Sequence, residues 1–103
     1  MTQSFTTIDV SVEDKHGRPT GQVASGPVVV VGRGADCALR IRDANVARKA
    51  LRLEIIDGAA YAIDMLSTGG IWGDDGKRFS RKRIGDGERI FVLADVALRV
   101  RLR

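Results

Sequence analysis

Apolar and polar residues alternate at every second position over much of this sequence. A β-strand with one buried face has this period of two, because successive side chains point to opposite faces. The alternating segments are residues 8–13, 51–56, 61–65 and 96–102. The pattern therefore predicts several strands, each with one face in a core and the other toward solvent.

Two further segments are apolar without a clear alternation. Residues 28–31 are four consecutive valines, and residues 89–93 have a similar character. β-branched residues favour strands, and a continuous apolar run is typical of a strand that is covered on both faces. We therefore expect these two strands to be buried on both sides.

Turn signals separate the expected strands at short intervals. Asp57-Gly58 lies between two alternating segments and strongly indicates a β-hairpin. The other turn signals lie at residues 15–19, 25–27, 68–70, 74–76 and 85–87. Many short strands with such spacing predict an all-β fold without a long helix, either a sandwich or a barrel. Without a repeat or linker, we expect one domain over residues 1–103.

Residues 43–54 fit this pattern least well. Val46, Ala47, Ala50 and Leu51 could share one face of a helix that Asp43 would cap. However, an alternation begins at Leu51 and continues to Ile55, and an isolated helix of ten residues is short. We interpret the segment as a loop that leads into a strand, with a short helix as the alternative.

Composition and charge narrow the function classes. The chain has 103 residues, of which 44% are apolar, enough for one domain with its own core. Cys37 is the single cysteine and agrees with a cytoplasmic setting. No apolar run approaches the roughly 20 residues of a membrane span, so we expect no membrane insertion. The net charge of +4 favours an acidic partner.

Five short motifs follow one another between residues 28 and 100. They are Gly32-Arg33, Asp36-Cys37-Ala38-Leu39, Val46-Ala47-Arg48-Lys49-Ala50-Leu51, Ser67-Thr68-Gly69-Gly70-Ile71 and Ile84-Gly85-Asp86-Gly87-Glu88-Arg89-Ile90. In this order they resemble the forkhead-associated domain family. The resemblance implies a β-sandwich of two twisted, mainly antiparallel sheets, whose loops at one end read phosphothreonine peptides.

Three signature residues of that family are absent here. Ala47 stands where the family has a serine that donates to the phosphate, and Ala50 stands where a histidine braces the loops. Gly69 stands where an asparagine holds the peptide backbone. A hydrogen bond to a charged group contributes about 1.5–3 kcal/mol, so losing the serine alone weakens phosphopeptide binding roughly 10- to 100-fold.

The resemblance also implies where a partner would bind. The corresponding positions that would face the phosphate or the peptide are Arg33, Arg48, Lys49, Ser67, Thr68 and Gly69. Because the signature residues are missing, we expect a phospho-independent adaptor for a protein partner, with weak or absent phosphothreonine binding. Degenerate members often act as cytoplasmic scaffolding modules, including in bacterial secretion machinery. The alternative is a phosphothreonine reader with an altered site built on Arg33, Arg48 and Thr68.

A basic run offers a third interpretation. Five of the seven residues between positions 77 and 83 are cationic, namely Lys77, Arg78, Arg81, Lys82 and Arg83. Such a run could bind nucleic acid. We favour an exposed edge strand, where charge prevents edge-to-edge pairing, because Phe79 alone makes a poor stacking platform. We expect the run to be mostly exposed, with Phe79 pointing inward.

Other candidate residues point away from catalysis. We expect Trp72 to anchor the core, with an interface hot spot as the alternative. His16 lies in an expected turn, and Cys37 has no identifiable base. Metal sites usually need several converging ligands, which one histidine and one cysteine cannot supply. We therefore expect no enzyme activity, no metal and no other cofactor.

Overall fold

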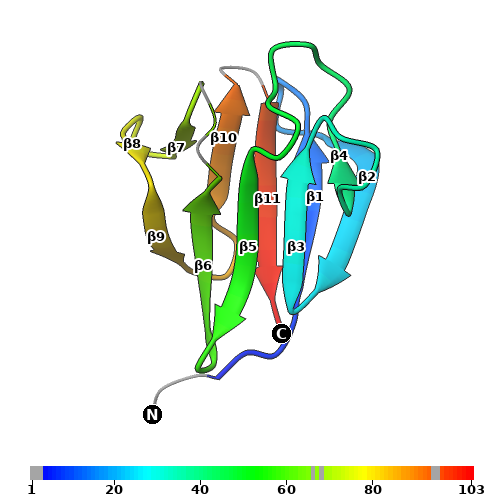
Figure 1. The fold of residues 1–103 in the computed structure, drawn as a ribbon. Coiled ribbons are helices and arrows are strands. Elements are labelled where there is room, and N and C mark those ends of the chain that lie inside the picture. Colours follow the sequence, from blue (N-terminus) through cyan, green and yellow to red (C-terminus); the bar gives the residue numbers. More distant parts are fainter. Residues whose placement is uncertain (1–3, 66, 68, 94–95) are drawn as a thin grey trace.

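The computed structural model describes residues 4–65, 67, 69–93 and 96–103. These residues form strands and loops, and the described part of the chain contains no helix (Figure 1). The strands are β1 (Ile8–Glu13), β2 (Pro19–Gly26), β3 (Val28–Gly32), β4 (Leu39–Arg40), β5 (Leu51–Ile56), β6 (Ala59–Asp64), β7 (Ile71–Gly73), β8 (Arg78–Phe79), β9 (Arg81–Ile84), β10 (Arg89–Leu93) and β11 (Val96–Leu102). In the described residues, no helix is long and apolar enough to cross a membrane.

The strands form two sheets that pack face to face as a β-sandwich (Figure 1). The six-stranded sheet has the order β2-β1-β11-β10-β7-β8, and the five-stranded sheet has the order β4-β3-β5-β6-β9. The pairing of β3 with β4 is parallel, and the other pairings between described strands are antiparallel. The predicted sandwich of two mainly antiparallel sheets is therefore confirmed.

The core lies between the two sheets and contains the apolar side chains of the alternating segments. Ile8 and Leu98 of one sheet and Leu51 and Leu53 of the other are 0% exposed. Full burial of one such side chain stabilises the fold by about 1.5–3 kcal/mol. Every second side chain of these strands is apolar because it points into the core between the sheets, where its burial stabilises the fold.

The Asp57-Gly58 turn joins β5 to β6, as the sequence predicts. The φ angles of Asp57 and Gly58 are 51° and 80°, so both residues lie in the left-handed region. A two-residue hairpin of type I′ needs positive φ at both positions, and Asp-Gly satisfies this requirement at low cost. Ile56 then pairs directly with Ala59 across the hairpin.

Residues 41–50 form a loop, which confirms the loop interpretation of the segment before β5. Val46 and Ala50 are 4% and 3% exposed, so the apolar side chains of the loop contribute to the core. The N–H of Ala50 donates to the carbonyl of Val31 over 2.8 Å and leads the chain into β5. The apolar residues that resemble a helical face are therefore explained by burial under an irregular backbone.

The expectation that β3 and β10 are covered on both faces is wrong. Val29 and Val31 are fully buried, whereas Val28 is 46% exposed. Ile90 and Val92 of β10 are buried, while Arg89, Phe91 and Leu93 are half-buried. A two-layer sandwich has no third layer, so the outer face of each sheet borders solvent even where its residues are apolar.

The basic run occupies the edges of both sheets. β8 ends the six-stranded sheet and β9 ends the five-stranded sheet. Arg78 and Arg81 are exposed, Lys82 is half-buried, and Phe79 packs against the core, as predicted. Cations at these edges hinder pairing with the strands of other molecules.

The first and last strands lie side by side. Ile8 of β1 is opposite Leu102 of β11, and Arg103 exchanges backbone hydrogen bonds with Thr7. Both ends of the chain therefore lie at the lower end of the sandwich, away from the loops that follow β3, β4 and β6 (Figure 1).

Candidate functional site

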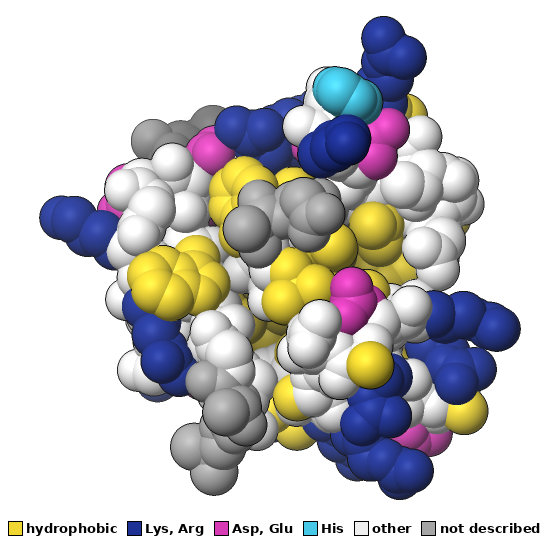
Figure 2. Space-filling model, turned by 90° about the horizontal axis from the view of Figure 1, so that it is seen from above, with side chains coloured by type: hydrophobic (Ala, Val, Ile, Leu, Met, Phe, Trp, Pro, Cys, Tyr) yellow, Lys and Arg dark blue, Asp and Glu magenta, His cyan; other side chains and the backbone are white. Residues whose placement is uncertain are grey.

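Three connections meet at the upper end of the sandwich (Figure 1). They are residues 33–38 between β3 and β4, residues 41–50 between β4 and β5, and residues 65–70 between β6 and β7. Viewed from above, Lys and Arg side chains gather on the side that lies over β3 and β4 (Figure 2, lower right). The described site residues of these connections, namely Arg33, Arg48, Lys49, Ser67 and Gly69, therefore belong to one end of the molecule.

A surface hollow of about 350 Å³ opens between the first two connections. Its lining consists of Arg33, Gly34, Ala35, Asp36, Arg40 and Arg48, and we call it the arginine hollow. Arg33 and Arg48 are expected site residues that the structure brings together here. Arg40 was missed by the sequence analysis, because a two-residue strand gives no periodic signal.

Hydrogen bonds to backbone carbonyls position two of these arginines. The Nε of Arg33 donates to the carbonyl of Val46 over 3.1 Å, and the Nε of Arg40 donates to the carbonyl of Arg33 over 3.0 Å. A guanidinium group has five N–H donors, so each of these contacts leaves several donors for a ligand. The backbone thus orients both side chains without neutralising their charge.

Positive charge exceeds negative charge in the arginine hollow. Among the ion pairs of the described residues, none includes Arg33, Arg40 or Arg48. Asp36 supplies the one carboxylate of the lining, and it pairs with Lys49 at 3.8 Å on the exposed surface. Arginine recognises carboxylate and phosphate groups with two parallel hydrogen bonds, so the hollow is suited to an anion.

The carbonyl of Arg48 fixes the loop against β3. It accepts hydrogen bonds from the N–H of Gly34 over 2.9 Å and from the Sγ of Cys37 over 3.1 Å. A Cβ atom on Gly32 would overlap this carbonyl, so glycine is required for the close approach of the two backbones. Cys37 therefore positions the Arg48 backbone, which gives the buried cysteine a structural role.

Two alanines of the loop, Ala47 and Ala50, supply backbone contacts and no side-chain donors. Ala47 accepts a hydrogen bond from the N–H of Arg33 over 2.9 Å. Ala50 is buried, and its carbonyl accepts from the N–H of Met65 over 3.0 Å, which connects the loop to the end of β6. The loop thus keeps its position without the serine and histidine of the signature.

The other expected site residues that the structure describes are not part of the lining of the hollow. Ser67 is buried, and its Oγ donates to the Oδ1 of Asp64 over 2.7 Å, so this hydroxyl is used internally. Gly69 is exposed, and a Cβ atom there would meet nothing within 4 Å. Thr68 lies outside the described residues, and Lys49 reaches the hollow only through Asp36.

The five cations of the basic run do not form one surface. The Nη2 of Arg78 donates to the carbonyl of Ser67 over 3.4 Å, and Arg81 stacks over the ring of Tyr61 at 4.8 Å. Lys82 pairs with Glu88 at 3.1 Å. Lys77 belongs to the β7–β8 hairpin, and Arg83 lies on β9. The cations of the run are therefore divided between the edges of the two sheets.

Trp72 points to solvent, so the expectation that it anchors the core is wrong. Ile71 and Gly73 of β7 are buried and face the core, so Trp72 between them must point outward. The indole is 38% exposed, and its Nε1 donates to the carbonyl of Gly69 over 3.2 Å. It lines a groove of about 510 Å³, the Trp72 groove, with Gly73, Asp74, Gly76, Phe91 and Leu93.

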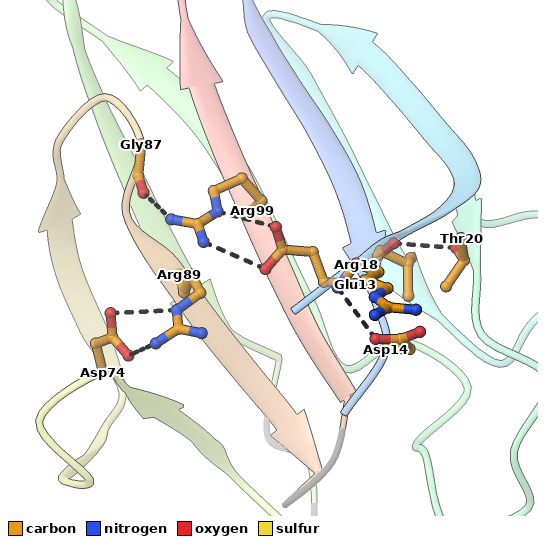
Figure 3. A network of polar contacts seen from close by, with 9 residues as sticks. Glu13, Asp14, Arg18, Thr20, Asp74, Gly87, Arg89 and Arg99 are labelled. Atoms are coloured by element: carbon orange, nitrogen blue, oxygen red, sulfur yellow. Dashed lines mark hydrogen bonds and ion pairs between the residues drawn. The ribbon is translucent and has the colours of Figure 1, made fainter. Parts of the chain in front are cut away.

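Ion pairs cross the outer face of the six-stranded sheet (Figure 3). Arg99 lies between the carboxylate of Glu13, at 3.1 Å from its Nε, and the carbonyl of Gly87, at 2.8 Å from its Nη1. Arg89 pairs with Asp74 at 2.8 Å. These arginines connect β1, β10 and β11 to neighbouring segments, and we call the two pairs the outer-face pairs.

Comparison with known proteins identifies the family. The family model described as FHA domain matches residues 29–92, which is more than half of the chain. This chain belongs to the FHA family. No curated protein sequence matches it. FHA domains are protein-interaction modules, usually phosphothreonine-binding, rather than enzymes.

Solved structures agree with the fold. The FHA-1 domain of Mycobacterium tuberculosis Rv1747 is 24% identical, with a TM-score of 0.75 over 94% of this chain and 97% of that one. The FHA domain of Chlamydia trachomatis CT664 is 13% identical, with a TM-score of 0.77 over 93% and 97%. A domain described for its phosphothreonine-dependent interactions is 24% identical, with a TM-score of 0.75 over 95% and 98%.

Proposed function

We propose that this FHA domain binds an acidic segment of a protein partner without depending on phosphothreonine. The observation that carries the proposal is the lining of the arginine hollow, which contains three arginines, whereas Ala47 in the neighbouring loop stands at the position of the phosphate-binding serine. Arginine binds carboxylates and phosphates alike through two hydrogen bonds. The hollow therefore attracts negative charge but has lost a donor that would favour phosphate.

The lack of side-chain groups that could hold the backbone of a bound peptide supports the same conclusion. Gly69 has no side chain to hold a bound peptide, and the hydroxyl of Ser67 is bonded to Asp64. A site that binds its ligand mainly through charge discriminates little between a carboxylate and a phosphate side chain. We therefore expect the domain to bind glutamate- and aspartate-rich segments nearly as well as phosphorylated ones.

A phosphothreonine reader with an altered site is the second candidate. Arg33 and Arg48 keep positions similar to phosphate-facing ones, and Arg40 adds a third guanidinium group to the same hollow. A phosphate at neutral pH carries between one and two negative charges, so three nearby cations could compensate for a missing hydroxyl donor. This candidate predicts a strong preference for phosphate over carboxylate.

Isothermal titration calorimetry with three matched peptides distinguishes the two candidates. The peptides share one acidic sequence and carry phosphothreonine, glutamate or threonine at a central position. We expect the wild-type domain to bind the phosphothreonine peptide with a Kd of about 0.1 mM or weaker, within about tenfold of the glutamate peptide. A micromolar Kd with a preference above about 100-fold for phosphothreonine would establish the second candidate.

Restoring the missing groups sharpens this experiment. Ala47→Ser adds a hydroxyl donor, and Gly69→Asn adds an amide in open space. We expect the double variant to gain at least about tenfold for the phosphothreonine peptide, because each new hydrogen bond contributes of order 1 kcal/mol. Arg33→Ala should abolish the gain. Arg42→Ala removes an exposed arginine outside the hollow and should leave it unchanged.

A further inference from the structure

The Trp72 groove lies outside the arginine hollow and shares none of its lining residues. The groove belongs to the outer face of the six-stranded sheet, where a two-layer fold normally presents polar residues. Cross-strand register instead places Ala97, Phe91 and Trp72 side by side on β11, β10 and β7. Three neighbouring strands therefore place an apolar row on this face, in which Trp72 is exposed, Phe91 is half-buried and Ala97 is buried.

The walls of the groove are held in place. The indole of Trp72 is fixed by its hydrogen bond to the carbonyl of Gly69. Arg89 lies over the ring of Phe91 at 5.5 Å while it pairs with Asp74. With a volume of about 510 Å³, the groove is within the usual range of ligand sites. A preformed apolar groove binds a side chain with little loss of conformational freedom.

Positive charge lies beside the groove. Arg78 is directly opposite Trp72 on β8 and is exposed, and it forms no ion pair with the described residues. The charge of Asp74 is balanced by Arg89, and Asp75 accepts a hydrogen bond from the backbone N–H of Lys77 in its own turn. Charge complementarity at Arg78 therefore favours an acidic residue next to the apolar group of a ligand.

We propose that the Trp72 groove docks an extended segment of a protein partner, which inserts one large apolar side chain and places an acidic residue against Arg78. Figure 2 shows apolar side chains exposed on the side over β7 and β10 (left). Tryptophan and arginine are enriched among the residues that dominate binding energy, and both meet here. The proposal is independent of the arginine hollow, because either surface can bind without the other.

The fluorescence of Trp72 tests the proposal directly, since it is the only tryptophan of the chain. The probes are three seven-residue peptides with blocked ends. The first has a central leucine between two pairs of glutamates and terminal glycines. The second replaces leucine by glycine, and the third replaces the glutamates by lysines. We expect a saturable blue shift with the first and at least about tenfold weaker binding of the other two.

Variants identify the surface that responds. Leu93→Ser and Arg78→Glu should each weaken binding of the leucine–glutamate peptide by about tenfold or more. Because Leu93→Ser also changes an apolar contact, circular dichroism must show that it folds, and the exposed Arg78→Glu provides the second test. Arg83→Glu makes the same charge change on β9, outside the groove, and should have no effect. Arg33→Ala should also have none, which separates this surface from the proposed function.

Three results would overturn the proposal. One is the absence of a saturable response to the leucine–glutamate peptide. Another is an equal response to the lysine peptide, which would remove the role of Arg78. The third is an emission shift that depends on protein concentration alone, because a second copy of the chain would then cover the groove.

Discussion

Two sets of arginines in this domain differ in their partners. Arg89 and Arg99 on the outer face of the six-stranded sheet each pair with a carboxylate, Asp74 and Glu13 (Figure 3). The arginines of the hollow, in contrast, form no ion pair among the described residues. The Glu13–Arg99 pair connects β1 to β11 and the Asp74–Arg89 pair connects β10 to the turn after β7, whereas the charge of the hollow is not balanced by an ion pair in the described part of the chain.

The two sets also differ in how they are positioned. A carboxylate fixes each outer-face arginine, and removing that carboxylate would leave a partly buried charge without a partner. Arg33 and Arg40 are instead oriented by backbone carbonyls, and Arg48 by the clamp of its loop onto β3. The geometry of the hollow therefore depends on the backbone.

The largest effect is expected where the backbone of the hollow is tightest. Gly32→Ala introduces a Cβ that overlaps the carbonyl of Arg48, so we expect a loss of about 2–3 kcal/mol in the free energy of unfolding. Urea denaturation measures this loss, and the Arg33-dependent peptide binding should disappear with it. Gly69→Ala is the matched control and should change stability by less than about 0.5 kcal/mol, since its Cβ would be free.

An intermediate effect is expected at the outer-face pairs. Glu13 is 8% exposed, and its loss would leave the partly exposed guanidinium of Arg99 without its carboxylate. We expect Glu13→Ala to lower the free energy of unfolding by about 1–2 kcal/mol, less than for a fully buried pair because Arg99 retains access to water. Arg48→Ala should change it by less than about 0.5 kcal/mol. Equal losses in the two variants would contradict the distinction between paired and unpaired arginines.

The smallest effect concerns an exposed pair and the pH. Hydrogen bonds from Arg103 and Ser25 lower the pKa of the Asp9 carboxyl in the folded state. A lowered folded pKa stabilises the fold at neutral pH, and this contribution is lost as the pH falls from the unfolded pKa of about 3.9 through the lower folded pKa. Because the Asp9 side chain is 34% exposed and its partner Arg103 is more so, we expect less than about 1 kcal/mol. Urea denaturation between pH 2.5 and 6 should show a shallower acid decline for Asp9→Asn.

Much of the framework follows from the sequence, because alternation and turn chemistry are local. Asp57-Gly58 specifies its hairpin through φ angles that few other residue pairs adopt as easily. The burial of β3 was misjudged because Val28 and Val30 are apolar although they face outward, which hides the period of two. Trp72 was misjudged for a related reason, since a strand of three residues is too short to reveal which side chains face the core.

The site was harder to derive, because it depends on contacts between distant segments. Arg33 and Arg48 belong to recognisable motifs. Arg40, in contrast, reaches the hollow because β4 pairs with β3 in parallel, which places Arg40 opposite Gly32. Nothing in the spacing shows that Ser67 bonds to Asp64 instead of facing a ligand. The pairing of Arg89 and Arg99 with carboxylates likewise requires the register of strands far apart in the sequence.

The pairing of β1 with β11 determines how this domain would respond to mechanical force. Residues 4–7 and Arg103 lie at the lower end of the sandwich (Figure 1), so tension between them would first break the backbone hydrogen bonds of Thr6 and Thr7 with Arg103 and then separate Ile8 from Leu102. The hydrogen bonds between these strands would then break one after another, as in a zipper, instead of sharing the load as in shear. A pull on both ends would therefore open the sheet at low force, beginning at the end of the molecule farthest from the arginine hollow.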